Sequence, residues 1–378
     1  MRTLRTAVPA LLAVVLSVPA LPAAAAAPAR TTIEVVADGL DTPRGLIYDA
    51  RRHRVLVAEA GEGGPARPHG GTCAVTEGGA QWCYGATGAV LQYTERSGSA
   101  RRIVDRLPSI GIYDETGDVR FSVIGLHDLT LDRRQRLQGV FGLTGDTRFR
   151  SDLGRGATGL AQVMRLDGTP RPSADLAEFE RRHDPDPSAA DTNPYALSAS
   201  PHGTMVADAS GNDLLYAKPD GSVSLVAVFP ARAPAGHPEE RIESVPAAVT
   251  QGPDGAWYVG ELTGFPYYKG EARVWRVVPG RAPTVFARGF TTITDLTFDG
   301  RGRLVVLEMA KEGLASPTDS VTGRLVRVER DGSRTDLATT GLANPGGVAY
   351  AGGGVYYVTN RSNSSGDVGQ LLRITVRG

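Results

Sequence analysis

The sequence lacks an excess of charge of either sign, and this narrows the classes of function. Its 378 residues include 41 Lys or Arg and 41 Asp or Glu, so the formal net charge at pH 7 is zero. A balanced charge argues against a phosphate-binding surface, and hence against nucleic-acid binding, as the main function. Hydrophobic residues make up 41% of the chain, which is too apolar for a disordered protein.

Several motifs of catalytic and cofactor sites are also missing. The sequence contains no G-x-S-x-G nucleophile motif, no H-E-x-x-H zinc motif and no phosphate-binding P-loop. Residues Gly154–Gly159 match the dinucleotide pattern G-x-G-x-x-G, but no strand–helix unit surrounds them. These motifs predict no cofactor, and whether the protein is an enzyme stays open.

Stretches without helix-breaking residues are scarce. Glycine occurs 47 times and proline 25 times, together roughly one residue in five. A helical bundle or a doubly wound α/β fold needs long runs without these residues, so the composition argues against both. The short apolar segments between the breakers alternate and end at turn residues, which is typical of β-strands. The sequence predicts an all-β protein.

The start of the chain has the pattern of a secretory signal peptide. Arg2 and Arg5 precede an apolar run, Ala7–Ala20, which passes into the small-residue stretch Ala23–Ala27. A membrane anchor is the alternative, but prolines interrupt the run, which is short for a bilayer span. We therefore predict residues 1–27 as a signal peptide and residues 28–378 as one secreted domain without a membrane span.

The two cysteines, Cys73 and Cys83, lie close together in a glycine-rich stretch. In an exported chain, two nearby cysteines most often form a disulfide. A metal or redox pair is the weaker alternative, because the spacing is not C-x-x-C and two thiols alone make a poor structural metal site. We predict a disulfide that orders this loop.

A repeated pattern runs through the rest of the chain. Each copy has a Pro or Gly entry, an apolar strand, a turn with Asp, Gly or Arg, and a second apolar strand that ends on an acid or amide. Later copies lie about 50 residues apart, as expected for four-stranded propeller blades, and insertions lengthen the first two. The pattern predicts a six-bladed β-propeller with long loops on one face. The equivalent positions in the six copies are Leu46, Leu129, Leu197, Val249, Leu296 and Val348.

The two ends of the chain complete the predicted propeller. The last copy has a third strand at Leu371–Val376, and Thr32–Val36, ahead of the first copy, can supply its fourth strand. Such closure removes open sheet edges. One helix is predicted in an insertion, over Ser173–Arg182, with Ser173 as its N-terminal cap.

Three segments resemble the ScyD/ScyE family: Thr42–Leu46, Cys83–Val90 and Tyr258–Pro266. That family consists of exported propellers with NHL-like repeats, and the resemblance covers essentially the whole mature chain. It implies the fold and export. It brings no established catalytic residues, so it does not specify the chemistry.

Polar side chains should collect at one mouth of the predicted channel, because the start of each first strand lies beside the end of the second. The second strands of four blades end on Glu59, Asp208, Glu261 and Glu308. Four converging carboxylates repel one another unless a cation neutralises them, and Ca²⁺ suits oxygen ligands. In outline this resembles the metal-dependent lactonase propellers of the SMP-30/gluconolactonase type. The alternative is structural, because acids at strand ends often bond the backbone of the next turn.

His127 and Asp128 begin the second copy and are the best candidates for a general acid or base, because histidine titrates near neutral pH. A histidine with satisfied hydrogen bonds in a turn is the alternative. The other polar residues expected at this mouth are Arg44, Asn193, Asp295 and Asn360.

Long loops on a rigid closed scaffold are where binding usually resides. Among these loops, Leu262–Gly270 concentrates the aromatic residues Phe265, Tyr267 and Tyr268, and Trp82 lies in another. We therefore expect a monomer whose loop face binds a small molecule, a glycan or an extracellular protein, and no nucleic acid. The competing hypothesis is a divalent-metal hydrolase, such as a lactonase, with Ca²⁺ as its cofactor.

Overall fold

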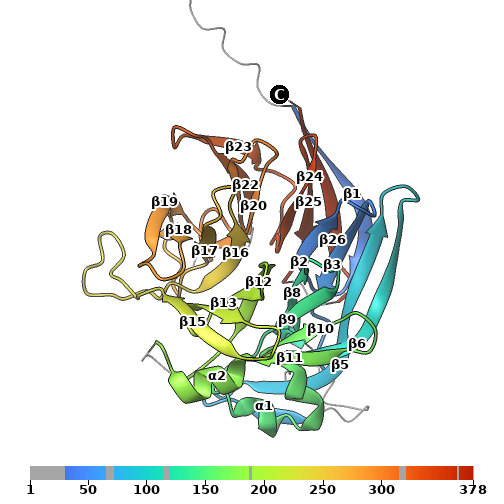
Figure 1. Cartoon of the computed structure of the whole chain (residues 1–378), viewed down its shortest axis with the longest axis vertical. Helices are drawn as coiled ribbons and strands as arrows, with labels where there is room; N and C mark the ends of the chain where they lie inside the picture. The colour runs from blue at the N-terminus through green and yellow to red at the C-terminus, as the bar shows by residue number, and fades with distance from the viewer. Residues whose placement is uncertain are drawn as a thin grey trace, which may run out of the picture.

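The computed structural model describes residues 30–64, 72–113, 119–186, 190–314, 321–363 and 366–377. The predicted signal peptide, residues 1–27, lies outside the described residues. Within them the chain is nearly all β, and six sheets surround a central axis (Figure 1). The prediction of an all-β, six-bladed β-propeller is confirmed.

Each blade begins with its innermost strand. Blade 1 contains β2 (Pro43–Asp49), β3 (Arg54–Glu59), β5 (Gln81–Thr94) and β6 (Ser99–Tyr113), with β4 (Cys73–Val75) and β7 (Val119–Ile124) added to it. Blade 2 contains β8 (Leu126–Leu131), β9 (Leu137–Phe141), β10 (Gln162–Arg165) and β11 (Arg171–Asp175). Blade 3 contains β12 (Pro194–Ala199), β13 (Thr204–Asp208), β14 (Asp213–Ala217) and β15 (Val223–Val228).

The second half of the chain is more regular. Blade 4 contains β16 (Pro246–Gln251), β17 (Trp257–Glu261), β18 (Ala272–Val277) and β19 (Thr284–Phe290). Blade 5 contains β20 (Ile293–Phe298), β21 (Leu304–Glu308), β22 (Arg324–Val328) and β23 (Arg334–Ala338). Blade 6 contains β24 (Val348–Gly352), β25 (Val355–Asn360), β26 (Gly369–Arg377) and, from the start of the chain, β1 (Arg30–Leu40).

The closure predicted from the sequence is confirmed. β1 pairs antiparallel with β26, from Arg30 opposite Arg377 to Leu40 opposite Gly369. The two ends of the described chain therefore lie side by side at the rim of blade 6 (Figure 1). This pairing gives blade 6 its fourth strand, so that it has four strands like blades 2 to 5.

The six aligned repeat positions occupy the same register in every blade. Leu46 pairs with Val57 in blade 1, and Val348 pairs with Val358 in blade 6. In blades 1 to 5 a bulge interrupts the pairing just before this position. Such bulges re-aim side chains. The bulged positions include Arg44, His127 and Tyr195, which places them together at one end of the channel.

The core is divided among the interfaces between blades. Each pair of neighbouring blades buries its own cluster of apolar side chains, such as Leu56, Leu126 and Phe141 between blades 1 and 2. A further cluster lies under the insertion of blade 1, where Trp82 is buried against Phe149. Burial of apolar area at these interfaces is the main force that holds the ring together.

The propeller has two faces, the turn face and the loop face, at opposite ends of the central channel. The turn face carries the tight turns between first and second strands, residues 50–53, 132–136, 200–203, 252–256, 299–303 and 353–354. The loop face is the opposite end, where inner strands begin and second strands end. It carries the insertions of blades 1 and 2 and the loop Leu262–Gly270, so the predicted long loops share one face.

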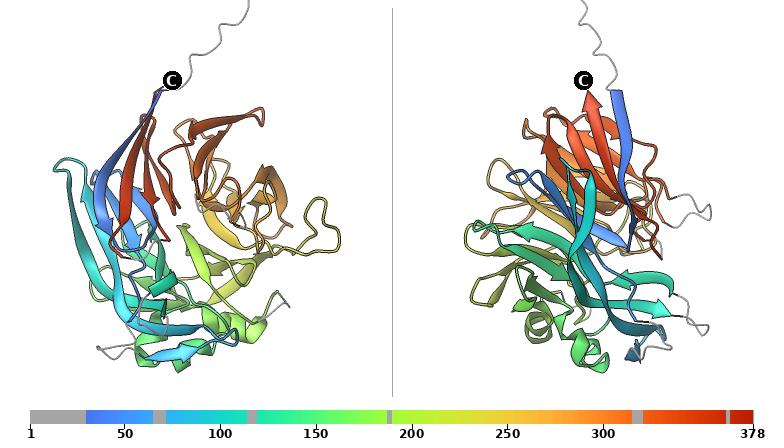
Figure 2. Two further views of the ribbon diagram at one scale, coloured as in Figure 1. Left: turned by 180° about the vertical axis from the view of Figure 1, so that it is seen from behind. Right: turned by 90° about the vertical axis from the view of Figure 1, so that its right-hand side faces the viewer.

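In the insertion of blade 1, the predicted disulfide joins strand β4 to the long strand β5. Cys73 in β4 is bonded to Cys83 in β5, which confirms that pairing. The hairpin of β5 and β6 bends past blade 1 and packs on the short helical segment η1 (Arg155–Gly159), while β4 contacts α1 (Phe149–Asp152) (Figure 2). The disulfide-bonded strands β4 and β5 are therefore part of a packed unit.

The predicted helix exists but begins later than expected. Helix α2 spans Leu176–His183, and its N-terminal cap is Asp175, whose side chain accepts the Glu178 N–H at 3.1 Å. Ser173, the predicted cap, belongs to strand β11. The outer strand of blade 2 runs on to Asp175, and this tertiary pairing decides where the helix starts.

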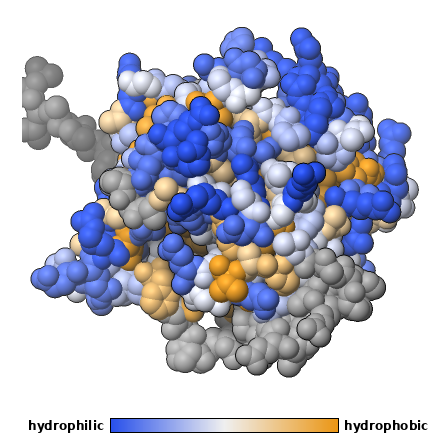
Figure 3. Space-filling model, turned by 90° about the horizontal axis from the view of Figure 1, so that it is seen from below, coloured by the Kyte–Doolittle hydropathy of each residue, from blue (hydrophilic) through white to orange (hydrophobic). Residues whose placement is uncertain are grey.

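The side of the molecule drawn in Figure 3 is mainly hydrophilic, with scattered hydrophobic side chains.

Candidate functional site at the mouth of the central channel

The inner strands of all six blades line a narrow cavity of about 240 Å³ on the axis. Its wall is formed by apolar and hydroxyl side chains, and its charged lining residues are Asp128 and Asp295. The two occupy equivalent places in blades 2 and 5, immediately before the aligned leucines Leu129 and Leu296. In a ring of six blades these positions lie on opposite sides of the axis.

Each of these aspartates ties its own inner strand to that of the next blade. Asp128 accepts the N–H groups of Leu129 at 2.8 Å and Leu197 at 3.0 Å. Asp295 likewise accepts from Leu296 and Val348, both at 2.7 Å. The carboxylates therefore join the inner strands of blades 2 and 3 and of blades 5 and 6.

Burial raises the pKa of both channel aspartates. The pKa of Asp295 rises to about 7, and the pKa of Asp128 rises well above its ordinary value because of burial and then the charge of Asp295. Two carboxyls that disfavour each other's ionisation titrate as one coupled pair. Burial thus favours the protonated, neutral form of both carboxyls.

His127 lies at the channel mouth, buried, and its environment keeps it neutral. Its ring packs against Tyr195 at a centroid distance of 4.8 Å, and Nδ1 donates to the Pro194 carbonyl at 3.1 Å. Burial, followed by the charge of Arg44, lowers the pKa of His127 to about 3. The residue predicted as an acid or base therefore does not titrate near neutral pH.

Two polar atoms at this mouth have no partner among the described residues. They are Nε of Arg44 and Oδ1 of Asn193, both buried. Arg44 donates a hydrogen bond from Nη2 to the Val123 carbonyl at 2.7 Å. Gly142 packs against both Asn193 and His127: a Cβ at this glycine would lie 2.5 Å from Asn193 Oδ1 and 2.2 Å from His127 Cε1. The two side chains are therefore neighbours. We call Arg44, His127, Asn193 and Tyr195 the mouth cluster; sequence analysis missed Tyr195.

The carboxylates predicted as a metal ring are fully buried, but each is engaged by residues of its own blade or of the segment that leads into that blade. Glu59 accepts from Arg102 at 2.7 and 2.8 Å and from the Asp41 N–H at 2.9 Å. Glu308 accepts from Arg324 at 2.6 Å and from the Thr291 N–H at 2.8 Å. These are the backbone bonds that the structural alternative expected.

Glu261 and Asp208 follow the same scheme. Glu261 accepts from Arg232 at 2.7 Å and Trp275 Nε1 at 2.6 Å. Asp208 accepts from the Thr192 hydroxyl and the Asn193 N–H. The amide of Asn360 plays the equivalent part in blade 6, accepting the Ala343 N–H at 2.8 Å. Within the described ranges, no three His, Cys, Asp or Glu side chains come together as a metal site.

Asp208 also has acidic neighbours that the sequence did not point to. Glu180 on α2 and Asp213 on β14 are buried, and no carboxylate oxygen of either has a hydrogen-bond partner in the described part of the chain. Burial, and then the charge of Asp208, raises the pKa of Glu180 to about 8 and that of Asp213 well above its ordinary value. Their separation in sequence left no recognisable motif.

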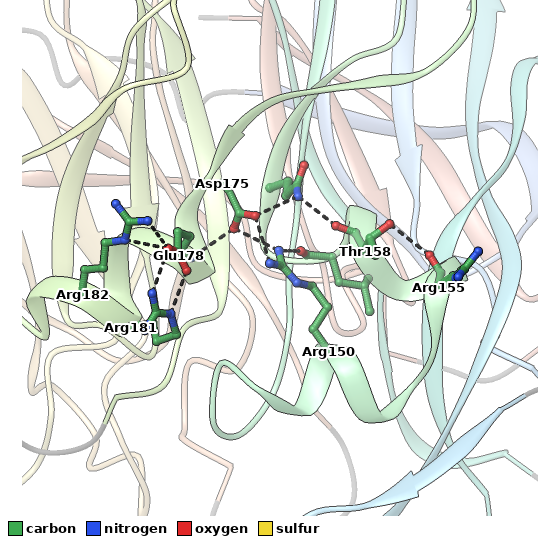
Figure 4. Close-up of polar contacts among 9 residues, drawn as sticks. Arg150, Arg155, Thr158, Asp175, Glu178, Arg181 and Arg182 are labelled. Carbon is green, nitrogen blue, oxygen red and sulfur yellow. Dashed lines mark hydrogen bonds and ion pairs between the residues drawn. The ribbon is translucent and has the colours of Figure 1, made fainter.

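The insertion of blade 2 is held in place by polar contacts. Arg150 donates to both oxygens of Asp175 at 3.0 and 2.9 Å and to the Leu160 carbonyl, and Gln162 bridges Asp175 and Thr158 (Figure 4). Trp82, predicted as aromatic surface, is buried in the cluster beneath. Polar contacts and a buried apolar cluster therefore hold this insertion against the fold.

In the loop Leu262–Gly270 of blade 4, one of the three aromatic residues faces solvent. Phe265 is 78% exposed and meets Tyr267 edge to face, with ring centroids 6.2 Å apart. Tyr268 is half-buried, donates to Glu240 at 2.6 Å and packs on His237. The loop is thus braced while the Phe265 ring faces solvent.

Solved structures of several propellers share this fold at low sequence identity. A structural genomics protein of unknown function from Bacteroides thetaiotaomicron aligns with a TM-score of 0.55 and 9% identity, over 92% of this chain and 76% of its own. A gluconolactonase from Xanthomonas campestris aligns at 0.53 and 12%, over 95% and 98%. Regucalcin, a calcium-binding protein from Agrobacterium tumefaciens, aligns at 0.51 and 11%, over 91% and 94%. At such identities the likeness shows the fold alone.

Sequence comparisons add no family. A scan against protein-family models gives no match, and a search of curated proteins gives no relative. The resemblance to the ScyD/ScyE family therefore stays a prediction. No helix in the described ranges is long and apolar enough to cross a membrane.

Proposed function

We propose that the protein is a secreted propeller of the ScyD/ScyE type, and that its loop face binds a small molecule, a glycan or an extracellular protein. The observation that carries the proposal is the 78% exposure of Phe265 on a braced loop. Leaving a phenyl ring in water costs free energy that burial against a ligand recovers. Exposed aromatics on rigid supports are typical anchors of binding surfaces.

The support of the loop indicates that Phe265 is held in a fixed position. Gly264 donates its N–H to the Glu243 carbonyl at 3.0 Å, and Thr263 donates to the Ser244 carbonyl at 3.1 Å. Together with the Tyr268–Glu240 bond, these contacts tie the loop to the segment before β16. A preformed loop loses little conformational entropy on binding.

The mouth cluster supplies polar recognition on the same face. The buried Nε of Arg44, a donor, and the buried Oδ1 of Asn193, an acceptor, lack hydrogen-bond partners among the described residues. A ligand that pairs with both would recover the cost of burying them unsatisfied. The loop face thus combines an apolar anchor with a donor and an acceptor.

Substitution of Phe265 tests the proposal. We expect purified wild-type protein to bind members of a glycan array or a panel of purified extracellular proteins, and Phe265→Ser to weaken the strongest interaction at least tenfold, about 1.4 kcal/mol. The matched control is Phe286→Ser, because Phe286 is 45% exposed but lies on outer strand β19 of the same blade. Equal binding by wild type and Phe265→Ser would contradict the proposal.

The buried carboxylates do not favour the competing hydrolase hypothesis. It needs carboxylates that converge on one ion, whereas Glu59, Glu261 and Glu308 are each paired with an arginine of their own blade region. The gluconolactonase likeness concerns the fold alone. The observed hydrogen bonds explain these acids without a shared ligand.

A further inference from the structure

A groove between blades 2 and 3 opens on the turn face, at the opposite end from the mouth cluster. Its cavity has a volume of about 370 Å³, within the range of small-molecule sites. The turn 132–136, strand β10 and the turn 200–203 form its walls. The lining includes five permanently positive side chains: Arg133, Arg134, Arg136, Arg165 and Lys218.

These positive charges are poorly neutralised. The carboxylate that lines the groove, Asp132, accepts Arg136 Nε at 2.7 Å and also caps the turn by accepting the Arg134 and Arg136 N–H groups. The other four cations form no ion pair with any residue in the described ranges. The groove therefore holds a surplus of positive charge within a small volume.

The neighbouring turns do not supply the missing carboxylates. Asp167, after β10, is exposed and forms no ion pair with a described residue. Asp220, after β14, is also exposed, and its Oδ1 accepts the N–H and hydroxyl of Ser222. Lys218 lowers the pKa of Asp220, but only as a smaller cause after the Ser222 bonds.

The equivalent groove between blades 5 and 6 shows that the turn itself does not require this surplus. Its turn 299–303 has the same D-x-R-x-R pattern, and its cavity is about 450 Å³. There Arg303 pairs with Asp299 and with Glu329. Arg327, which has the register of Arg165, also pairs with Glu329, at 2.6 Å. A second carboxylate neutralises one groove and not the other.

The groove between blades 2 and 3 also contains uncharged hydrogen-bonding groups. The buried Gln138 accepts the Thr204 hydroxyl at 2.8 Å through Oε1, which leaves its amide nitrogen as a donor. Ser173 and Ser200 contribute hydroxyls to the lining. Cations and neutral donors around one cavity match the many acceptor oxygens of phosphate.

We propose that this groove binds a small, soluble ligand with two or more phosphate groups. Several unpaired cations need more negative charge than one carboxylate offers, and planar guanidinium groups pair with phosphate oxygens bidentately. The site is separate from the loop face, so the proposal does not rest on the function proposed for that face. The protein would then hold two ligands at opposite ends of its axis.

Calorimetric titration of the mature protein with inorganic pyrophosphate tests the site. We expect binding, and we expect Arg165→Gln combined with Lys218→Gln to weaken it at least tenfold, because two charge-assisted hydrogen bonds are lost. The matched control is Arg301→Gln combined with Arg330→Gln near the groove between blades 5 and 6. Unchanged melting temperatures of both double variants will show that the fold is intact.

Three results would overturn the proposal. They are failure of wild-type protein to bind pyrophosphate, binding that survives Arg165→Gln with Lys218→Gln, and equal weakening by both double variants, which would indicate only a generally basic face. Vesicles of phosphatidylglycerol are a second probe; vesicle binding without pyrophosphate binding would replace the soluble ligand by a lipid headgroup. Phe265→Ser should leave pyrophosphate affinity unchanged.

Discussion

At the scale of single residues, the buried carboxylates at strand ends form hydrogen bonds and ion pairs that hold the strands of a blade to the segment leading into it. Sequence reasoning found the right positions, because strand-end acids recur in each repeat, but it could not find their partners. Arg102 reaches Glu59 from strand β6, and Arg232 reaches Glu261 from the segment after β15. Nothing local in the sequence connects such pairs, so a converging metal ring and a set of separate ion pairs looked alike.

Glu261→Gln separates these two interpretations at one residue. We expect the variant to lose about 3 kcal/mol or more of unfolding free energy, because Arg232 is left without its buried counter-charge. Urea denaturation with EDTA and with added Ca²⁺ should give the same loss. Asp254→Asn, which removes a more exposed partner of Arg276, is the control and should cost about 1 kcal/mol or less. A loss seen only with Ca²⁺ would restore the metal interpretation.

At the scale of elements, the repeat made the strands predictable and tertiary contacts set what remained. The aligned leucine and valine positions have identical registers, since alternation and turn residues fix strand pairing locally. The start of α2 escaped prediction because β11 holds Ser173 in a strand. Likewise, the sequence placed β1 correctly without showing that its middle faces solvent: Val35 is 49% exposed.

The closing strand can be tested with two residues of β1. Leu40 is completely buried in the cluster between blades 6 and 1, so we expect Leu40→Ala to cost about 2–5 kcal/mol of unfolding free energy. Val35→Ala in the same strand should change it by about 0.5 kcal/mol or less. Chemical denaturation of both variants measures the difference. Equal and small effects would mean that β1 contributes little to closure.

At the scale of the whole molecule, a net charge of zero conceals an uneven distribution of charge. Cations that form no ion pair with a described residue gather in the groove of the turn face, whereas Glu180, Asp208 and Asp213 lie buried together on the other side of the fold. The balanced composition argued against a phosphate-binding surface as the main function. A net charge does not report how charge is distributed, so it could not reveal one small basic groove. The propeller ring was predictable from repetition, but these clusters join residues from different blades and leave no linear motif.

The buried acids make stability depend on pH, and Glu180 provides the test. Its pKa is about 8 in the folded protein against an ordinary 4.5, raised by burial and by Asp208, Asp184, Asp191 and Asp186. The stabilisation from its protonated form is complete below pH 4.5 and is lost as pH rises through 8, because the folded state holds the proton more tightly. We expect the melting temperature of the wild type to fall across this window.

Glu180→Gln should flatten that fall, because the amide stays neutral at every pH, although Asp208 and Asp213 will leave a residual slope. Glu239→Gln, which neutralises an exposed side chain, is the matched control and should keep the wild-type profile. Melting curves at several pH values between 4.5 and 8.5 measure the effect. Parallel profiles for the wild type and Glu180→Gln would show that Glu180 is not a proton-holding group, and that other buried acids, such as the channel pair, set the pH dependence.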